Sequence, residues 1–243
     1  MERSLVYFVS DVHLGLDMKD PAAREARFIS FLESIPVERT RALYLLGDIW
    51  DFWYEYRDVV PREGIRVVSH LIRLMDAGVE IYFFEGNHDI WTFSFFESLG
   101  MKKVRQPYHT TIGGKDFCMG HGDGVGGAKF GYRLMLKVFH ARWAQKLFSL
   151  LHPGMAFRLA TKWSNSNRRT HAPYHFRGAD EPLYRFAAED SASRHMDFYV
   201  FGHFHDRVDM ELPSGARLVV LKDWMDGGAP HAVFDMESGM LEA

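Results

Sequence analysis

The sequence contains a single cysteine, Cys118, among its 243 residues, so no disulfide bond can form within the chain. Its neighbours are apolar, which favours a small buried side chain over a reactive thiol. Long apolar runs are also missing. No uncharged stretch approaches the roughly 18–20 residues of a membrane span, and the apolar run at 5–9 is shorter than the roughly 7–15 residues of a secretory signal. These absences favour a cytoplasmic protein.

Acidic residues are missing from one segment, 128–177, which contains ten of the 29 Lys and Arg residues. The rest of the chain is correspondingly acidic, with 19 basic and 32 acidic residues and a net charge of −13. Within the segment, the apolar spacing predicts one helix over 130–151 and a second over 155–163. We therefore predict a single domain, 1–243, with a basic and apolar helical cap inserted at 128–177. The apolar face of the first helix is expected to contain Leu136, Phe139, Trp143, Leu147 and Leu150.

Short apolar runs that end in polar clusters recur through the remainder of the chain and predict buried strands. Helical patterns over 22–34 and 65–77 separate the early runs, an alternation typical of an α/β fold with parallel strands. A turn at 213–215 joins two further apolar runs and predicts a hairpin. We expect two packed sheets flanked by helices. The predicted strands that precede polar clusters are 5–9, 42–46, 79–84, 117–119 and 198–201.

The polar clusters consist of residue types that bind divalent cations. Each follows a predicted strand, and the carboxyl ends of parallel strands form the edge where α/β sheets bind ligands. Carboxylate and amide oxygens and imidazole nitrogens are ligands for Mn²⁺, Fe²⁺ or Zn²⁺. One D-x-H or H-x-H motif arises easily by chance, whereas five clusters at five strand ends do not. The predicted metal ligands are Asp11, His13, Asp48, Asn87, His121, His203 and His205.

The order of these motifs, D-x-H, G-D-x-x-D, G-N-H-D, G-H and G-H-x-H, resembles that of the calcineurin-like metallophosphoesterases. The resemblance implies a four-layer α/β/β/α sandwich and two divalent cations, which would acidify a shared water and neutralise phosphate oxygens. It implies that one ion is held by Asp11, His13, Asp48 and His205. The other would be held by Asp48, Asn87, His121 and His203, with Asp48 bridging the two.

Several residues beside these ligands are surplus to the coordination of the metals. His88 follows the ligand Asn87, so we predict that it donates a hydrogen bond or a proton during the reaction. Asp89 is expected to orient the His88 ring, which makes these two the candidate catalytic residues. Asp51 and Asp123 are predicted to be hydrogen-bonding partners of ligand histidines.

A closer resemblance is to the UDP-2,3-diacylglucosamine hydrolases of lipid A biosynthesis. It implies Mn²⁺-dependent cleavage of the substrate pyrophosphate to UMP and 2,3-diacylglucosamine 1-phosphate, with the acyl chains between the cap and the core. The features that support it are Phe52-Trp53-Tyr54, His121-Gly122-Asp123, Gly131-Tyr132, Asn165-Ser166 and Asp223-Trp224. The substrate-binding residues expected from it are Asn87, His88, Asn165, Ser166 and His203.

One departure from that family keeps a second function open. Its best-known members have Arg where this chain has His88, and an imidazole is not equivalent to a guanidinium at a phosphate. The alternative is a metallophosphodiesterase or pyrophosphatase that acts on another nucleotide or lipid phosphate. A non-catalytic scaffold would usually have lost ligands, and the full set is present here. The expected partners are a lipid-linked sugar nucleotide and, through the basic cap, the anionic cytoplasmic face of the inner membrane. The overall charge of −3 gives no indication of nucleic-acid binding.

Overall fold

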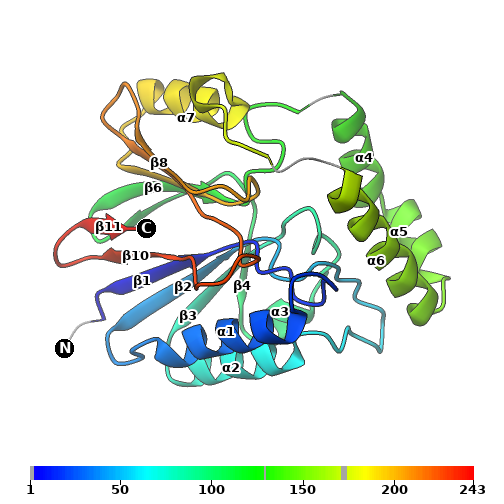
Figure 1. Ribbon diagram of the computed structural model, residues 1–243. Helices are drawn as coiled ribbons and strands as arrows, with labels where there is room; N and C mark the ends of the chain where they lie inside the picture. Colours follow the sequence, from blue (N-terminus) through cyan, green and yellow to red (C-terminus); the bar gives the residue numbers. More distant parts are fainter. Residues whose placement is uncertain (1–2, 129, 171–173) are drawn as a thin grey trace.

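Two β-sheets pack face to face, and helices cover the outer face of each sheet (Figure 1). The computed structural model describes residues 3–128, 130–170 and 174–243, and side chains at 163 and 165–170 lie outside this description. The arrangement confirms the α/β class and the four layers, α/β/β/α, that the motif order implied.

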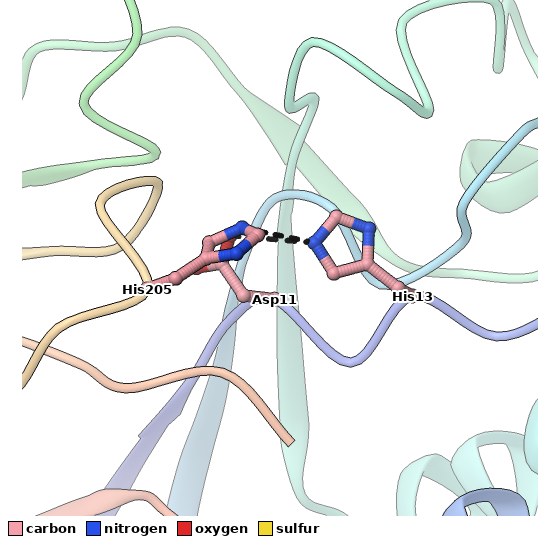
Figure 2. Close-up of side chains that lie close together, drawn as sticks. All are labelled: Asp11, His13 and His205. Carbon is pink, nitrogen blue, oxygen red and sulfur yellow. Dashed lines mark hydrogen bonds and ion pairs between the residues drawn. The ribbon is translucent and has the colours of Figure 1, made fainter. Parts of the chain in front are cut away.

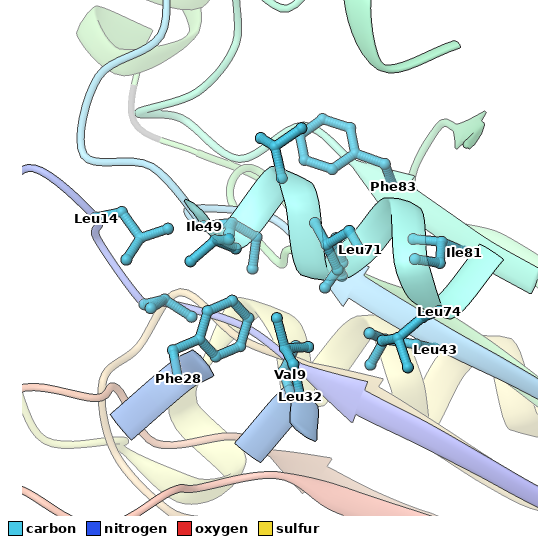
Figure 3. Close-up of a cluster of buried hydrophobic side chains, with 14 of the residues drawn as sticks. Val9, Leu14, Phe28, Leu32, Leu43, Ile49, Leu71, Leu74, Ile81 and Phe83 are labelled. Carbon is cyan, nitrogen blue, oxygen red and sulfur yellow. The ribbon is translucent and has the colours of Figure 1, made fainter. Parts of the chain in front are cut away.

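The first sheet has four parallel strands at its centre and one edge, followed by two antiparallel strands. Its strands lie in the order β11 (Met240–Glu242), β10 (Ala232–Asp235), β1 (Leu5–Val9), β2 (Thr40–Leu46), β3 (Glu80–Phe84) and β4 (Lys102–Val104). The helices α1 (Pro21–Ser34), α2 (Ile65–Asp76) and the short α3 (Phe95–Ser98) cover its outer face. Figure 3 shows Phe28 and Leu32 of α1 and Leu71 of α2 packed against β1 and β2.

The second sheet is also parallel at its centre. Its strands lie in the order β5 (Tyr108–Ile112), β6 (Lys115–Gly120), β7 (Phe198–Phe201), β9 (Arg217–Val220) and β8 (Val208–Glu211). The antiparallel pair β8–β9 confirms the predicted hairpin. The helix α7 (Pro182–Ser193), preceded by the 3-10 turn η1 (Gly178–Asp180), covers the outer face. Cys118 is buried on that side, and burial raises the pKa of its thiol, which agrees with the structural role predicted for it.

Three helices between β6 and η1 lie beside the four layers rather than within them (Figure 1). These insertion helices are α4 (Phe130–His140), α5 (Arg142–Ser149) and α6 (Pro153–Thr170). The prediction of one helix over 130–151 was wrong, because Ala141 is extended, with φ −74° and ψ 123°, and separates α4 from α5.

The break also changes which residues face the core. Leu136 and Phe139 pack against the buried Tyr54 and Trp91, as an apolar face should. Trp143, Leu147 and Leu150 were predicted to share that face, but they are 65%, 63% and 80% exposed. In α5 it is Phe148 that turns towards the core.

Candidate metal centre

All seven predicted ligands lie at the carboxyl ends of central parallel strands, where the two sheets meet. Asp11 and His13 follow β1, Asp48 follows β2, and Asn87 follows β3. From the second sheet, His121 follows β6, and His203 and His205 follow β7. The parallel register therefore brings together residues separated by almost 200 positions.

The first group of ligands consists of Asp11, His13 and His205 (Figure 2). The Nε2 atoms of the two histidines are 3.2 Å apart, and Nε2 of His205 is 3.2 Å from Oδ1 of Asp11. That carboxylate oxygen is buried and accepts no hydrogen bond. Two imidazole nitrogens and an otherwise unsatisfied carboxylate oxygen that converge in this way fit a divalent cation.

The second group is centred on His121. Its Nε2 lies 3.2 Å from Asn87 Oδ1, 3.2 Å from His203 Nδ1 and 3.3 Å from Asp48 Oδ2. Its other nitrogen, Nδ1, donates to the carbonyl of Leu46 at 3.0 Å. Because a carbonyl can only accept, this bond keeps the proton on Nδ1 and makes Nε2 the nitrogen that can bind a metal once it is deprotonated. The second donor set therefore also fits a divalent cation.

Asp48 connects the two groups. Its Oδ2 faces His121 and also lies 3.9 Å from Nε2 of His13 in the first group. Its Oδ1 accepts the backbone N–H of His88 at 2.8 Å. One oxygen is thus fixed by the loop after β3, and the other faces both donor sets, which is the geometry that a bridging carboxylate requires.

The backbone around these ligands is strained. Five of them adopt a positive φ, a conformation that costs a non-glycine residue about 1–3 kcal/mol and concentrates at functional sites. These residues are Asp11 (53°), His13 (50°), Asp48 (52°), His203 (72°) and His205 (55°).

Two glycines make room for the ligand carboxylates. A Cβ on Gly86 would lie 2.2 Å from Asp48 Oδ1, and a Cβ on Gly202 would lie 2.4 Å from Asp11 Oδ2. The glycines of the G-N-H-D and G-H-x-H motifs are therefore steric requirements of the site.

The charges of the site also suit cations. Burial alone would raise the pKa values of Asp11 and Asp48, but the facing histidines outweigh it and hold both well below their usual range. Burial alone would lower the pKa of His205, yet the adjacent carboxylates of Asp11 and Asp223 raise it to about 9. Burial and the neighbouring His121 lower the pKa of His203 to about 4. The site therefore contains ionised carboxylates in a buried setting.

Of the two carboxylates predicted to hydrogen-bond to ligand histidines, Asp51 lies beside one and Asp123 does not. Asp51 Oδ1 is 3.3 Å from Nδ1 of His13, and the Asp51 carbonyl is 2.9 Å from Nδ1 of His88. Asp123 contacts the side chains of Gln106 and Tyr132 rather than a ligand imidazole. The side chains of the predicted substrate residues Asn165 and Ser166, in α6, fall outside the described part of the chain.

Asp89 does not have the position that was expected of an orienting partner for His88. Its two carboxylate oxygens accept backbone N–H groups of Asp48, Ile49, Trp50 and Gly86 at 2.7–3.3 Å. The carboxylate thus ties the loop after β2 to the loop after β3. The residue in contact with His88 Nδ1 is Asp51, because the G-N-H-D turn directs the Asp89 side chain inward.

Two residues support the ligands in a role that the sequence did not reveal. Asp223, noted in the sequence only as part of the Asp223-Trp224 pair, has its Oδ2 3.1 Å from Nδ1 of His205. Arg24, in α1, is fully buried and donates to the carbonyls of His13 and Leu16 at 3.0 and 2.7 Å. An arginine in a helix looks like a surface residue in the sequence, so no local pattern could have identified it.

A cavity of about 840 Å³ opens beside the ligand groups. His88, 25% exposed, lines it together with Asp48, Asn87 and His203, and Tyr132 of α4 also contributes to the lining. A smaller cavity of about 370 Å³ lies between Asp51 and α6, lined by Phe52, Phe157, Arg158 and Lys162 among others. Both cavities thus border the insertion helices.

The model of one protein family, the calcineurin-like phosphoesterases, matches residues 4–207. The chain belongs to the calcineurin-like phosphoesterase family. This membership makes it a metal-dependent phosphoester hydrolase and implies two divalent cations, for which the two donor sets are the candidate ligands. Both the enzyme class and the family resemblance predicted from the motifs are confirmed.

Several relatives within the family are named UDP-2,3-diacylglucosamine hydrolase. The one from Porphyromonas gingivalis is 38% identical, and the alignment covers 99% of this chain and 98% of the relative. The one from Neisseria gonorrhoeae is 29% identical over 90% of this chain and 89% of the relative. Among solved structures, a dimetal phosphatase from Danio rerio has a TM-score of 0.51 at 15% identity, covering 96% and 92% of the two chains, and shares the fold.

Among the described residues, no helix is both long enough and apolar enough to cross a membrane.

Proposed function

We propose that this protein is a Mn²⁺-dependent UDP-2,3-diacylglucosamine hydrolase, which cleaves the pyrophosphate to UMP and 2,3-diacylglucosamine 1-phosphate. The observation that supports it most is the large cavity, which is lined both by ligand residues such as Asp48 and His203 and by Ala128, Tyr132 and Tyr174 of the inserted segment. A diacylated sugar nucleotide needs both, since its phosphates need cations and its acyl chains need apolar surface. Relatives with this name match almost the full chain.

The metal-holding residues would be the two donor sets, with Asp48 shared between them. When bound, the two cations would supply an acidified water and neutralise charge on the phosphate oxygens. Asp51, Asp223 and the carbonyl of Leu46 hold the outer nitrogens of His13, His205 and His121, which fixes the direction of each imidazole.

His88 is the proposed proton or hydrogen-bond donor. It lies on the cavity wall, next to His13 and Asp51, and is not one of the seven ligands assigned to the two donor sets. Its Nδ1 lies 2.9 Å from a carbonyl, so Nδ1 must bear a proton. The second nitrogen, Nε2, can then donate only when the ring is doubly protonated. Oδ1 of the Asp51 carboxylate also lies 3.5 Å from Nδ1.

Segment 128–177 would act as a cap over the site and as its contact with the membrane. In α5, the exposed Trp143 and Leu147 lie one helical turn apart. The exposed Arg142 directly precedes Trp143, and the exposed Lys146 directly precedes Leu147. Such a surface suits the anionic cytoplasmic face of the inner membrane, where each Lys or Arg contributes about 1 kcal/mol. A peripheral position would bring the enzyme to its lipid-linked substrate.

The test is direct. Purified protein loaded with Mn²⁺, Fe²⁺ or Zn²⁺ is incubated with UDP-2,3-diacylglucosamine and with soluble nucleotide diesters. We expect UMP and the lipid sugar 1-phosphate to be released fastest with Mn²⁺. Hydrolysis of the soluble diesters alone would contradict the proposed substrate and support the broader phosphodiesterase function.

A further inference from the structure

Three aromatic side chains of the core donate hydrogen bonds to main-chain carbonyls in the insertion helices and the loop after α5. Trp91 Nε1 donates to the carbonyl of Phe139 at 2.8 Å, and the Tyr54 hydroxyl donates to that of Gln145 at 2.7 Å. The Tyr56 hydroxyl donates to the carbonyl of Leu151 at 3.3 Å. Because the acceptors are backbone atoms, these contacts fix the path of the inserted chain itself.

Tyr54 and Trp91, which we call the docking pair, come from the two loops that hold the predicted catalytic site. Tyr54 follows Asp51 by three residues, and Trp91 follows His88 by three residues. Tyr54 and Trp91 form an isolated parallel β-bridge, and the N–H of Glu55 donates to the Trp91 carbonyl at 3.0 Å. The bond between Asp51 and His88 therefore lies at the base of two loops that are joined to each other.

The docking pair is also packed against the insertion helices. Tyr54 and Trp91 are only 2% and 7% exposed. The ring of Phe148, from α5, lies 4.9 Å from that of Tyr54 and 4.7 Å from that of Trp91. Phe139, from α4, lies 5.4 Å from Trp91. Since such an interior is closely packed, α4 and α5 cannot shift without moving one ring of the pair.

We propose that Tyr54 and Trp91 are positioning residues: by docking the insertion helices they fix the two loops that orient His88. The inference rests on the proposed role of His88. It means that contacts between a substrate and the insertion helices are transmitted to the catalytic site over three residues of each loop. Small misplacements of a catalytic group have large kinetic effects, up to about 10²-fold for about 1 Å.

The test removes one donor at a time. Tyr54→Phe and Trp91→Phe each delete a bond of the docking pair, and Tyr56→Phe deletes an equivalent bond outside the bridge. With Mn²⁺-loaded protein and bis(p-nitrophenyl) phosphate, we expect the first two to lower kcat about tenfold with KM unchanged. The Tyr56→Phe control should stay within about twofold, and every variant should retain two metal equivalents and its melting temperature within a few degrees.

A double-mutant cycle with His88→Ala separates positioning from general damage. If the docking pair acts through His88, Tyr54→Phe should change kcat by less than about twofold in the His88→Ala background. The same tenfold loss in that background would overturn the proposal, as would a loss restricted to the KM of the lipid substrate. The diester is too small to need the insertion helices, so the cycle is independent of the proposed lipid substrate. If the wild-type enzyme hydrolyses only the lipid nucleotide, kcat for the double-mutant cycle is measured with that substrate.

A spectroscopic measurement gives a readout without turnover. In Zn²⁺-loaded protein labelled with ¹⁵N-histidine, the Nδ1 resonance of His88 reports its bond to the Asp51 carbonyl. We expect this resonance to shift or broaden in Tyr54→Phe and Trp91→Phe and to stay in place in Tyr56→Phe. An unchanged resonance in both docking-pair variants would contradict the inference.

Discussion

Oδ2 of Asp48 lies 3.3 Å from Nε2 of His121, and the other oxygen of Asp48 is occupied by the backbone N–H of His88. The same Oδ2 faces the first donor set, so both sets share this one atom. We predict that Asp48→Ala abolishes activity and removes most of the bound metal, because the Asp48 carboxylate faces both sets. Metal analysis of the purified variant checks this. Two retained equivalents would contradict the bridging role.

His88→Ala should keep both metals, because the ring is in neither donor set, and should lower turnover roughly 10²–10⁴-fold, the range for a positioned proton donor. Metal analysis and kcat on the same preparation measure both effects. Normal turnover, or loss of a metal, would refute the role.

His88→Arg tests the protonation state that the structure requires. Since Nδ1 lies on a carbonyl, Nε2 donates only from the imidazolium. If donation from Nε2 is the role of His88, the doubly protonated ring is the active form, and kcat of the wild type should fall as the pH rises. Arginine stays charged over the whole pH range of the assay. The kcat of His88→Arg should therefore not show this fall at alkaline pH, and it should exceed that of His88→Ala. Identical pH profiles of wild type and His88→Arg would show that the fall has another origin.

Metal loading should release protons. The carboxylates raise the pKa of His205 to about 9 and that of His121 well above its usual value, against the opposing effect of burial. At neutral pH the metal-free site therefore contains protonated imidazoles, which must lose a proton to bind a cation. Affinity should fall as pH is lowered. Calorimetric titration in two buffers of different ionisation enthalpy measures the protons released, and identical enthalpies in both buffers would contradict the prediction.

The strands and the metal ligands could be predicted because each depends on short local patterns. A buried run followed by G-D, G-N-H-D or G-H-x-H encodes both the strand and the polar cluster, and parallel pairing then brings the clusters together. The glycines in these motifs have a reason visible only in the structure, since Gly86 and Gly202 leave no space for a Cβ beside the ligand carboxylates.

The errors arose where long-range packing decides the outcome. Asp89 was paired with its sequence neighbour His88, whereas its oxygens cap backbone N–H groups 39–41 residues away. Arg24 supports the loop of His13 from a helix that no motif marks, and the contact of Asp223 with His205 could not be read from the Asp223-Trp224 pair. At Ala141 the chain breaks between α4 and α5, and both helices dock on Tyr54 and Trp91. Local apolar spacing cannot predict these long-range contacts.

The exposed apolar side chains of α5 give a prediction about membrane contact. Trp143, Leu147 and Leu150 are 63–80% exposed, so replacing all three with serine should leave the fold intact. It should weaken binding to vesicles that contain anionic lipid, because apolar burial at the interface contributes about 25 cal/mol per Å². Co-sedimentation with such vesicles, together with thermal melting, measures both effects.

The matched control is Phe148→Ser on the same helix, which turns inward against Tyr54 and Trp91. It should lower the melting temperature, whereas the triple variant should not. Neutralising Arg142 and Lys146 should weaken vesicle binding at low salt and have little effect at about 1 M salt, where the screening length falls to about 3 Å. If the triple variant bound vesicles as tightly as the wild type, α5 would not be the contact surface, and the exposed apolar residues would have to serve the substrate instead.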